Sequence, residues 1–379
     1  MGILEQIFSP EERDYIEKTR FRFSRPLFAS WEELRQETVL VFGGGIYGTG
    51  IVDLLLSQGV RPVCMLDSDT RKHGNMHKGI AVKPVDILGA HKDAVVVLTS
   101  AHAGSMYEDC SAYAVRTILP IDLPETPMPI TPIGLRPEEL ADKKDLLDFY
   151  LALDADSRNI LRQFMLCQFT LNRRHLTDIY DPNPYFSSSL MPLIDYSVFC
   201  DLGASVGDTL RDYLDLTPAA KGAFHYYAFE PDGESFAELA RASAGRNNVV
   251  AVNAAVGDRD CRCRTYGTGT GTSLLPEEFK EPGECDVVSL DKFFVGRTPL
   301  PTVIKADVEG YEAEALRGAE NLLREHRPAL ILSIYHKKYD FFEIPMFIKS
   351  LNLGYAFHVR HQSKSYGETV VYAVQAGAR

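Results

Sequence analysis

Two glycine-rich turns, one in each half of the chain, limit the folds open to this sequence more than any other feature. The first lies in VLVFGGGIYGTGIVDLL, residues 39–55, and the second lies in FCDLGASVGDTL, residues 199–210. Each turn follows a short apolar run typical of a buried strand and precedes a run with helical periodicity. Glycine lets the backbone approach a ligand closely, and the first turn of a helix presents N–H groups. The two turns therefore predict two Rossmann-like units, each able to hold a nucleotide-like cofactor.

The chain has 379 residues, which is more than one ordinary core organises and favours two domains. Residues 1–37 are predicted as a helical lead-in, because SPEE at residues 9–12 has the spacing of a capping box. Residues 38–125 predict an accessory Rossmann-like domain of nucleotide-binding type. A proline-rich run, LPETPMPITPIGLRP, marks a linker that we place at residues 126–140, since proline continues neither a helix nor a central strand.

Residues 141–379 are predicted as a helical preface followed by a second doubly wound domain. From residue 196 on, strand-like runs such as YSVFCDLG, HYYAFE and TVIKADV alternate with helical runs, as in a mostly parallel sheet. The last two runs, YAFHVRH and ETVVYAV, predict an antiparallel hairpin at the sheet edge. The predicted fold class is therefore α/β, with two Rossmann-like doubly wound domains.

Charge and cysteine usage exclude several classes of protein. The 40 basic and 52 acidic residues give a net charge of -12 without a dense basic run, so we expect no nucleic-acid partner. The 7 cysteines are an odd number without a C-x-x-C pair, which favours reduced thiols over a disulfide framework. The longest apolar runs are far shorter than a membrane span, and the start of the chain lacks a secretory leader pattern. We therefore expect a cytoplasmic protein without membrane insertion.

Small and acidic residues follow the strands around the second turn. The strand before the turn ends at Asp201, and the turn holds Gly203, Ala204 and Gly207. The next strand ends at Glu230, and an ionised carboxylate there can accept hydrogen bonds from both hydroxyls of a ribose. This pattern favours a ribose-containing ligand, whereas an unliganded strand-to-helix turn is the alternative interpretation of the glycines alone.

The two strands that come later along the chain extend the same predicted edge. One ends in small residues around Asn253 and Ala254, which suit a flat adenine packed against backbone, and another delivers Asp307 and Glu309. The second turn contains no lysine or arginine to bind a pyrophosphate. The edge therefore favours a ligand with a ribose and a positive centre, such as S-adenosylmethionine, whose sulfonium prefers negative surroundings.

The runs DLGASVGDTL, YAFEPD, VVAVNAAVGD and IKADVEGYEAEAL resemble, in order and spacing, the FkbM-type methyltransferase family over about residues 195–375. The resemblance implies a class I methyltransferase fold and S-adenosylmethionine-dependent O-methylation of a hydroxyl on a carbohydrate or polyketide-like acceptor, either a small molecule or a glycan. It also implies a cofactor site lined by Asp201, Gly203, Gly207 and Glu230, with Asp307 nearby. Ser205 stands where the family usually has Asn, and we expect this small polar residue to preserve cofactor binding.

Methyl transfer to a hydroxyl is assisted by a base within hydrogen-bond reach. His336, which follows the fifth strand in SIYHKKYD, is the first candidate, and Glu309 and His361 are the others. Each has a plainer interpretation, as a histidine of an exposed loop or as a carboxylate in the first turn of a helix, where the dipole favours it. The spacing of His336, Asp340 and His361 matches no familiar metal site, so we predict no metal.

The first turn contains G-x-G-x-x-G at Gly43, Gly45 and Gly48, and Asp67 ends the next strand. This is a credible dinucleotide fingerprint, and the domain resembles the Rossmann-like amino-terminal domains of bacterial sugar-modifying enzymes. An oxidoreductase would need more, because neither a Tyr-x-x-x-Lys pair nor a separate substrate domain follows. Three interpretations stay open: a module that binds a nucleotide or nucleotide-sugar and presents the acceptor, a ligand-free domain that dimerises into a homo-oligomer, and an NAD(H)-dependent oxidoreductase acting on nucleotide sugars.

Overall fold

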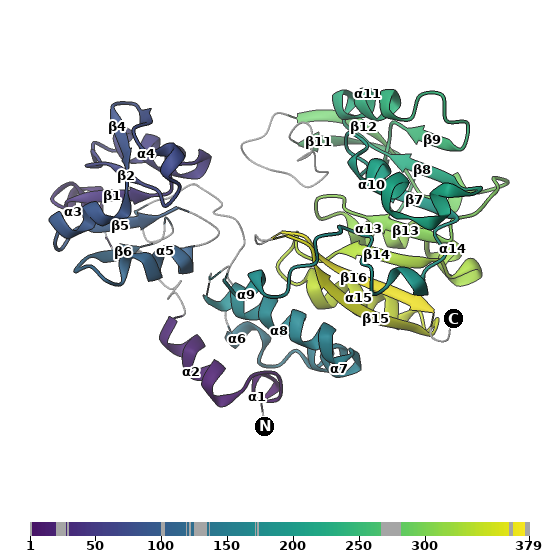
Figure 1. The fold of residues 1–379 in the computed structure, drawn as a ribbon, viewed down its shortest axis with the longest axis horizontal. Helices are drawn as coiled ribbons and strands as arrows, with labels where there is room; N and C mark the ends of the chain where they lie inside the picture. Colours follow the sequence, from purple (N-terminus) through teal and green to yellow (C-terminus); the bar gives the residue numbers. More distant parts are fainter. Residues whose placement is uncertain are drawn as a thin grey trace. The chain divides into compact units, whose positions relative to one another are not determined.

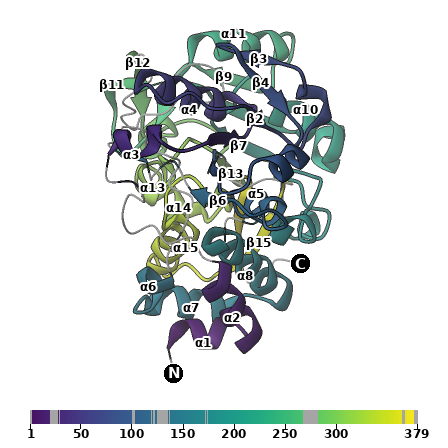
Figure 2. The ribbon, with the colours of Figure 1, turned by 90° about the vertical axis from the view of Figure 1, so that its left-hand side faces the viewer.

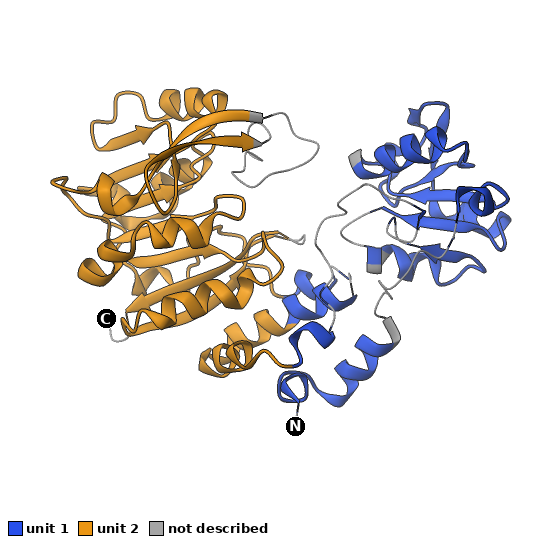
Figure 3. Cartoon of the chain, turned by 180° about the vertical axis from the view of Figure 1, so that it is seen from behind, with its two compact units in different colours: residues 1–141, 163–178 blue, residues 142–162, 179–379 orange. Residues whose placement is uncertain are grey.

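The structure is a computed structural model, and it describes residues 2–19, 28, 30–99, 103–118, 120, 123–124, 135, 137–170, 172, 174–266, 282–363 and 367–375. The chain divides into two compact units (Figure 3). Unit 1 comprises Met1–Ala141 and Gln163–Asp178, and unit 2 comprises Asp142–Arg162 and Ile179–Arg379. Most of the predicted linker at residues 126–140 lies outside the described residues. No helix among the described residues is both long and apolar enough to cross a membrane.

Unit 1 contains a six-stranded sheet in the order β3-β4-β2-β1-β5-β6, in which every strand pair except β3–β4 is parallel (Figure 1). Its strands are β1 (Val39–Phe42), β2 (Met65–Leu66), β3 (Met76–His77), β4 (Ile80–Lys83), β5 (Val95–Leu98) and β6 (Arg116–Ile118). Its helices are α1 (Ile3–Ile7), α2 (Pro10–Thr19), α3 (Trp31–Arg35), α4 (Ile46–Ser57), α5 (Ala103–Cys110), α6 (Pro137–Leu140) and α9 (Arg174–Thr177), with 3-10 turns η1 (Thr70–Lys72) and η2 (Val85–Ala90).

Both faces of the unit 1 sheet are covered, because successive residues of its central strand point to opposite sides. Val39 and Val41 of β1 pack in one cluster with Leu55 of α4, and α4 lies beside β2 and β4 in both views (Figures 1 and 2). Leu40 of β1 belongs to a second cluster, which includes Cys110 of α5. The sequence-based expectation of a doubly wound, Rossmann-like sheet in this region is confirmed.

Unit 2 contains a seven-stranded sheet and a small three-stranded one. The strands are β7 (Val198–Leu202), β8 (His225–Phe229), β9 (Val249–Val252), β10 (Ala255–Val256), β11 (Cys261–Tyr266), β12 (Pro282–Val288), β13 (Val303–Ala306), β14 (Ala329–Ser333), β15 (Tyr355–His361) and β16 (Thr369–Gln375). The helices are α7 (Lys144–Ala152), α10 (Asp208–Leu216), α11 (Gly233–Ala242), α12 (Leu290–Phe293), α13 (Glu312–Arg317), α14 (Glu320–His326) and α15 (Asp340–Ser350), with η4 (Met191–Leu193) and η5 (Pro218–Lys221). Helix α8 (Ala155–Thr170) contributes residues to both units.

The seven strands follow the order β15-β16-β14-β13-β7-β8-β9. The five strands from β14 to β9 pair in parallel, whereas β16 pairs antiparallel with both β14 and β15. The predicted antiparallel hairpin at the sheet edge is therefore confirmed; it is drawn in yellow in Figure 1. The strand order reverses at β7, which has β8 on one side and β13 on the other, and such a switch point opens a crevice at the carboxyl ends of the strands.

An aromatic cluster supports β7 from one face. The ring of Phe199 stacks on that of Tyr226 with centroids 5.2 Å apart, and Tyr213 of α10 packs against both rings. All five residues of β7 are buried, as expected for a central strand of a parallel sheet covered on both faces. Rigid packing of β7 fixes the position of the glycine turn that follows it.

Candidate active site

A cavity of about 380 Å³ lies at the carboxyl edge of the unit 2 sheet, where the strand order reverses. Segments that follow β7, β8, β9, β13 and β14 form most of its walls, and the loops before β7 and β16 add Pro184, Tyr185 and Glu368. Carboxylates dominate the described lining residues: Asp208, Asp212, Glu230, Asp307, Glu309 and Glu368, against Lys305 as the one lysine. The cavity therefore favours a ligand with positive charge and hydrogen-bond donors.

The second glycine turn forms one wall of this cavity. A Cβ on Gly203 would lie 1.9 Å from the carbonyl oxygen of Asp307, so only glycine fits where the turn crosses the end of β13. Gly203 has φ +78° and Gly207 has φ +82°, both in the left-handed region that favours glycine. Ala204 is buried, and its N–H donates to the carbonyl of Phe229 (2.9 Å). Gly207 is the N-cap of α10 and offers no side-chain acceptor to the first N–H groups of the helix.

Four residues other than glycine hold left-handed φ values at the cavity. They are Tyr185 (φ 60°), Ser205 (φ 47°), Glu309 (φ 52°) and Glu368 (φ 68°). Each such conformation costs on the order of 1–3 kcal/mol, and residues of this kind cluster where a structure holds side chains for function. The backbone around the cavity is therefore strained at the positions that direct polar side chains into it.

Glu230, at the end of β8, is held by the backbone of the turn. Its Oε2 accepts from Ser205 N–H (2.8 Å), and its Oε1 accepts from Asp232 N–H (2.8 Å). Burial raises the pKa of Glu230 to about 7, although the two backbone donors act in the opposite direction. Glu230 lines the cavity, and each carboxylate oxygen has a further lone pair, so the side chain has the capacity to accept from two neighbouring hydroxyls of a ribose.

Asp201 is fully buried and is not among the described residues that line the cavity. Asp201 and Lys305 are register partners on β7 and β13, which places their side chains on one face of the sheet. Lys305 Nζ lies 2.9 Å from Asp201 Oδ1 and donates to the carbonyl of Gly203 (2.9 Å), while Tyr226 donates to Asp201 Oδ2 (2.7 Å). Asp201 therefore acts on the turn through Lys305.

Asn253 and Ala254 follow β9. The amide of Asn253 donates to the carbonyls of Glu230 (2.9 Å) and Pro231 (3.2 Å), which ties the ends of β8 and β9 together. Ala254 is buried and lines the cavity, so its small side chain leaves room for a flat ring against the backbone.

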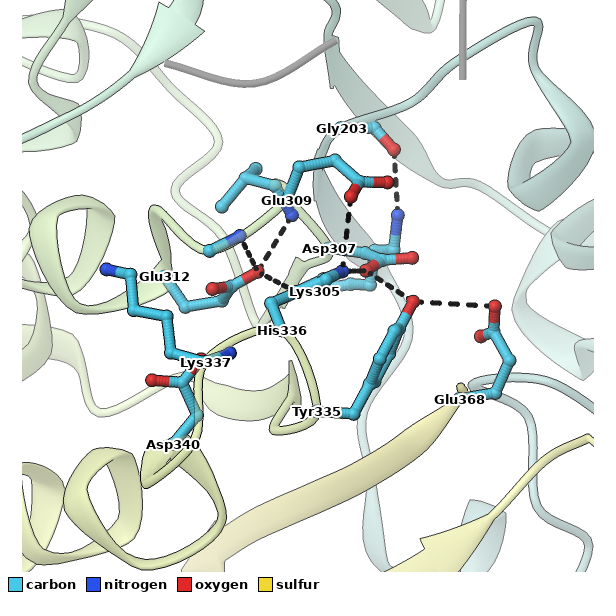
Figure 4. A network of polar contacts seen from close by, with 12 residues as sticks. Gly203, Lys305, Asp307, Glu309, Glu312, Tyr335, His336, Lys337, Asp340 and Glu368 are labelled. Carbon is cyan, nitrogen blue, oxygen red and sulfur yellow. Dashed lines mark hydrogen bonds and ion pairs between the residues drawn. The ribbon is translucent and has the colours of Figure 1, made fainter. Parts of the chain in front are cut away.

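His336 lies at the same edge, between three carboxylates (Figure 4). Its Nδ1 is 2.8 Å from Glu312 Oε1, and its Nε2 is 3.4 Å from Asp307 Oδ1 and 3.7 Å from Glu309 Oε2. Burial acts against the charged imidazole, but Glu312 and the other two carboxylates outweigh it and raise the pKa of His336 to about 10. In this arrangement the imidazole carries a proton near neutrality and cannot accept another from a hydroxyl.

Glu368, in the loop before β16, is a carboxylate that sequence reasoning did not single out. Burial, with the charge of Asp307 as second cause, raises the pKa of Glu368 to about 7. Tyr335 donates to Glu368 Oε1 (3.5 Å) and to Asp307 Oδ1 (3.3 Å), and Tyr185 donates to Asp307 Oδ2 (2.7 Å). Glu368 therefore faces the cavity beside two phenols with a pKa suited to proton transfer near neutral pH.

The two remaining candidates for the base lie in different surroundings. Glu309 lines the cavity, with its side chain 39% exposed. His361 is fully buried on β15, with its Nδ1 2.9 Å from Thr369 Oγ1, and it is not among the described residues of the cavity wall. The structure thus brings His336 and Glu309 together and leaves His361 inside the hairpin.

The first glycine turn, in unit 1, is closed by its own acidic residue. Asp67 Oδ2 accepts from Gly44 N–H (2.8 Å) and from Lys72 Nζ (2.9 Å). A Cβ on Gly48 would lie 1.6 Å from the carbonyl oxygen of Gly43, and Gly45 begins α4 without a side-chain cap. Gly48 is thus needed for close helix-to-strand packing, whereas a Cβ on Gly45 would meet nothing within 4 Å. Nucleotide binding at this turn stays a prediction.

The cofactor implied by the sequence fits the residues of the unit 2 cavity. Gly203 lines the cavity at the turn, Glu230 offers paired acceptors for a ribose, and Ala254 leaves room for an adenine. The sheet order, the terminal hairpin and the cavity at the switch point are those of a class I methyltransferase fold.

Residues 201–357 match the family model described as Methyltransferase FkbM domain, so the chain contains a domain of this type and is an S-adenosylmethionine-dependent methyltransferase. The crystal structure of methyltransferase FkbM from Methylobacillus flagellatus KT is similar in fold, with a TM-score of 0.69 and 20% sequence identity, over 98% of this chain and 95% of that chain.

Aeropyrum pernix fibrillarin bound to S-adenosyl-L-methionine is less similar, with a TM-score of 0.32 and 13% sequence identity over 48% of this chain and 68% of that chain. No curated protein matches the chain.

Proposed function

We propose that this methyltransferase methylates a hydroxyl oxygen of a carbohydrate or polyketide-like acceptor. The observation that carries the proposal is the wall formed by Glu368, Tyr335 and Tyr185, in which a carboxylate with a pKa raised to about 7 stands beside two phenolic hydroxyls. A polyhydroxylated acceptor offers the hydrogen-bond donors that such a wall accepts. Thiol acceptors need no such base, because a thiol loses its proton near neutral pH far more readily than a hydroxyl.

S-adenosylmethionine, when bound, supplies the electrophilic methyl group. Glu230 and the turn at Gly203 would hold its ribose and amino-acid ends, while the surrounding carboxylates favour the sulfonium charge. Glu368 would accept the proton of the acceptor hydroxyl, and Tyr185 and Tyr335 would orient the acceptor oxygen. The main contribution of the enzyme to the rate of such a displacement is to hold the acceptor oxygen in line with the methyl–sulfur bond.

The test is methyl transfer from radiolabelled S-adenosylmethionine to acceptor panels at pH 7.5. One panel contains monosaccharides, nucleotide-sugars and macrolide alcohols, and the matched panel contains amines and thiols of similar size. We expect label to enter hydroxyl compounds, with a product that resists mild acid as an ether does. Transfer confined to amines or thiols would refute O-methylation while leaving the methyltransferase assignment intact.

A further inference from the structure

We propose that Asp307, Glu309 and His336 form a binding site for one divalent metal cation in the cavity wall, with Glu312 positioning the imidazole. Asp307 and Glu309 line the cavity, so the cation would face the acceptor. Binding of the cation is independent of the proposed O-methylation, whereas its role toward the acceptor rests on that proposed function. The metal set considered from sequence spacing joined His336 to Asp340 and His361, and Glu309 was interpreted as a carboxylate at a helix start.

The first argument is the set of separations around His336 Nε2. Its distances of 3.4 Å to Asp307 Oδ1 and 3.7 Å to Glu309 Oε2 exceed ordinary hydrogen bonds. Two ligands of one cation, each about 2.1 Å from it, lie about 3.0–3.4 Å apart at octahedral or tetrahedral angles. Asp307 is already at this separation, and the Glu309 oxygen lies slightly beyond it.

The second argument is that His336 Nε2 is buried and aimed at these oxygens. The His336 side chain is 8% exposed, and Nε2 makes no hydrogen bond to any described residue. Figure 4 shows the ring edge pointing to the space between the Asp307 and Glu309 carboxylates. A buried nitrogen directed at two oxygens without a hydrogen bond is the arrangement that a cation would complete, and it is independent of the mere presence of acidic residues.

The third argument is that the imidazole is also held through its other nitrogen, Nδ1. Glu312 is fully buried, and its Oε1 accepts from His336 Nδ1 (2.8 Å), from Val308 N–H (3.0 Å) and from Gly310 N–H (3.4 Å). One oxygen thus holds both the ring and the loop that carries Asp307 and Glu309. Metal-binding histidines commonly donate their other nitrogen to a carboxylate in this way, which fixes the tautomer and directs the free nitrogen to the metal.

The donor set indicates the class of cation and the use that the site would serve. One imidazole nitrogen with two carboxylate oxygens suits Mn²⁺, Fe²⁺ or Zn²⁺ better than a site made of oxygens alone would. Three protein ligands leave coordination positions open toward the cavity, where two neighbouring oxygens of an acceptor would bind. The substrate class that follows is a vicinal diol or a hydroxy-carbonyl compound, which can use both open positions.

The test is titration of the full-length, chelator-treated protein with MnCl₂, with free Mn²⁺ measured by electron paramagnetic resonance and no acceptor present. We expect one Mn²⁺ per chain in the wild type. Glu312→Gln, which removes the negative charge beside Nδ1 while keeping the size of the side chain, is expected to weaken binding by about 10- to 100-fold. Glu309→Gln, at a partly exposed position, should also weaken binding at least tenfold without loss of folding, as checked by circular dichroism.

His326→Gln is the matched control, because His326 lies at the end of α14 with its side chain 41% exposed and is not part of the cavity wall. It should bind Mn²⁺ as the wild type does. Competition by ZnCl₂ and MgCl₂ in the same titration identifies the preferred cation. Absence of stoichiometric binding of all three cations, or wild-type binding by folded Glu309→Gln and Glu312→Gln, would overturn the metal site. The imidazole would then serve as a charged link between carboxylates, and acceptor methylation measured separately would still decide the proposed function.

Discussion

Replacing Glu230 by alanine should weaken S-adenosylmethionine binding without unfolding the domain. The carboxylate accepts from Ser205 N–H and Asp232 N–H at 2.8 Å each, and Glu230 lines the cavity. A hydrogen bond to a charged group is worth about 1.5–3 kcal/mol. A net loss of about 2–3 kcal/mol raises the dissociation constant by about 30- to 140-fold. Isothermal titration calorimetry at pH 8.5, where the wild-type carboxyl is ionised, measures this ratio directly.

The raised pKa of Glu230 makes the same ratio depend on pH. Because the pKa is raised to about 7, the free wild-type protein holds mostly the protonated acid at pH 6 and mostly the carboxylate at pH 8.5. The carboxylate is the better acceptor for hydroxyls, so wild-type affinity should increase by up to about tenfold between these pH values. Glu230→Ala should lack this increase. The ratio of the two dissociation constants is therefore expected to narrow at pH 6.

Asp67→Ala is the control for this experiment, because Asp67 closes the first glycine turn, in the other unit. It should bind S-adenosylmethionine as the wild type does at both pH values. If Asp67→Ala lost affinity while Glu230→Ala kept it, the assignment of the cofactor to the second turn would be wrong. An affinity of Glu230→Ala within threefold of wild type at pH 8.5 would refute the ribose contact itself.

Three further changes test other parts of the site. Lys305→Met leaves Asp201 buried without its ionic partner and should lower the free energy of unfolding by about 3–5 kcal/mol. The loss is measured as a lower midpoint of the thermal unfolding transition whose midpoint rises when S-adenosylmethionine is added. Adding Asp201→Asn should recover most of the lost stability, and no recovery would contradict the ion pair. Glu368→Gln should lower kcat by about 100-fold or more and remove the rise of kcat through about pH 7, which a pH-rate profile checks against wild type. Gly203→Ala places a Cβ 1.9 Å from the Asp307 carbonyl oxygen and should abolish cofactor binding in calorimetry, and unchanged binding would exclude the tight turn described above.

Local patterns in the sequence predicted the fold well, because they depend on neighbouring residues. The capping box at the start of α2 is confirmed by reciprocal bonds, with Glu12 N–H donating to Ser9 Oγ (3.2 Å) and Ser9 N–H donating to Glu12 Oε2 (2.9 Å). The doubly wound sheets and the terminal antiparallel hairpin are confirmed for the same reason. Helix α8, whose residues divide between the two units, was beyond such reasoning, since periodicity does not show which core a helix joins.

The arrangement of the site was harder to predict, because it depends on strand register and on burial. Asp201 ends a strand and was expected to meet the cofactor, but its register partner on β13 is Lys305, whose charge holds it inside the sheet. A lysine within the buried run TVIKADV was the one available signal for that pair. Glu368 enters from a loop far along the chain, and its pKa is set by burial, which no local pattern reveals. Likewise, the sequence placed His336 at the active edge but did not show the carboxylates around it.

The close approach of Gly203 to the Asp307 carbonyl oxygen has a thermodynamic consequence for the order in which ligands bind. The turn proposed to hold the cofactor and the loop that carries the proposed cation ligands pack closely at these two residues. A ligand that fixes one of them therefore lowers the cost of fixing the other. Linkage requires the effect to be reciprocal: whatever factor S-adenosylmethionine adds to the affinity for Mn²⁺, the cation must add to the affinity for S-adenosylmethionine. Cofactor and cation would then cooperate before any acceptor arrives.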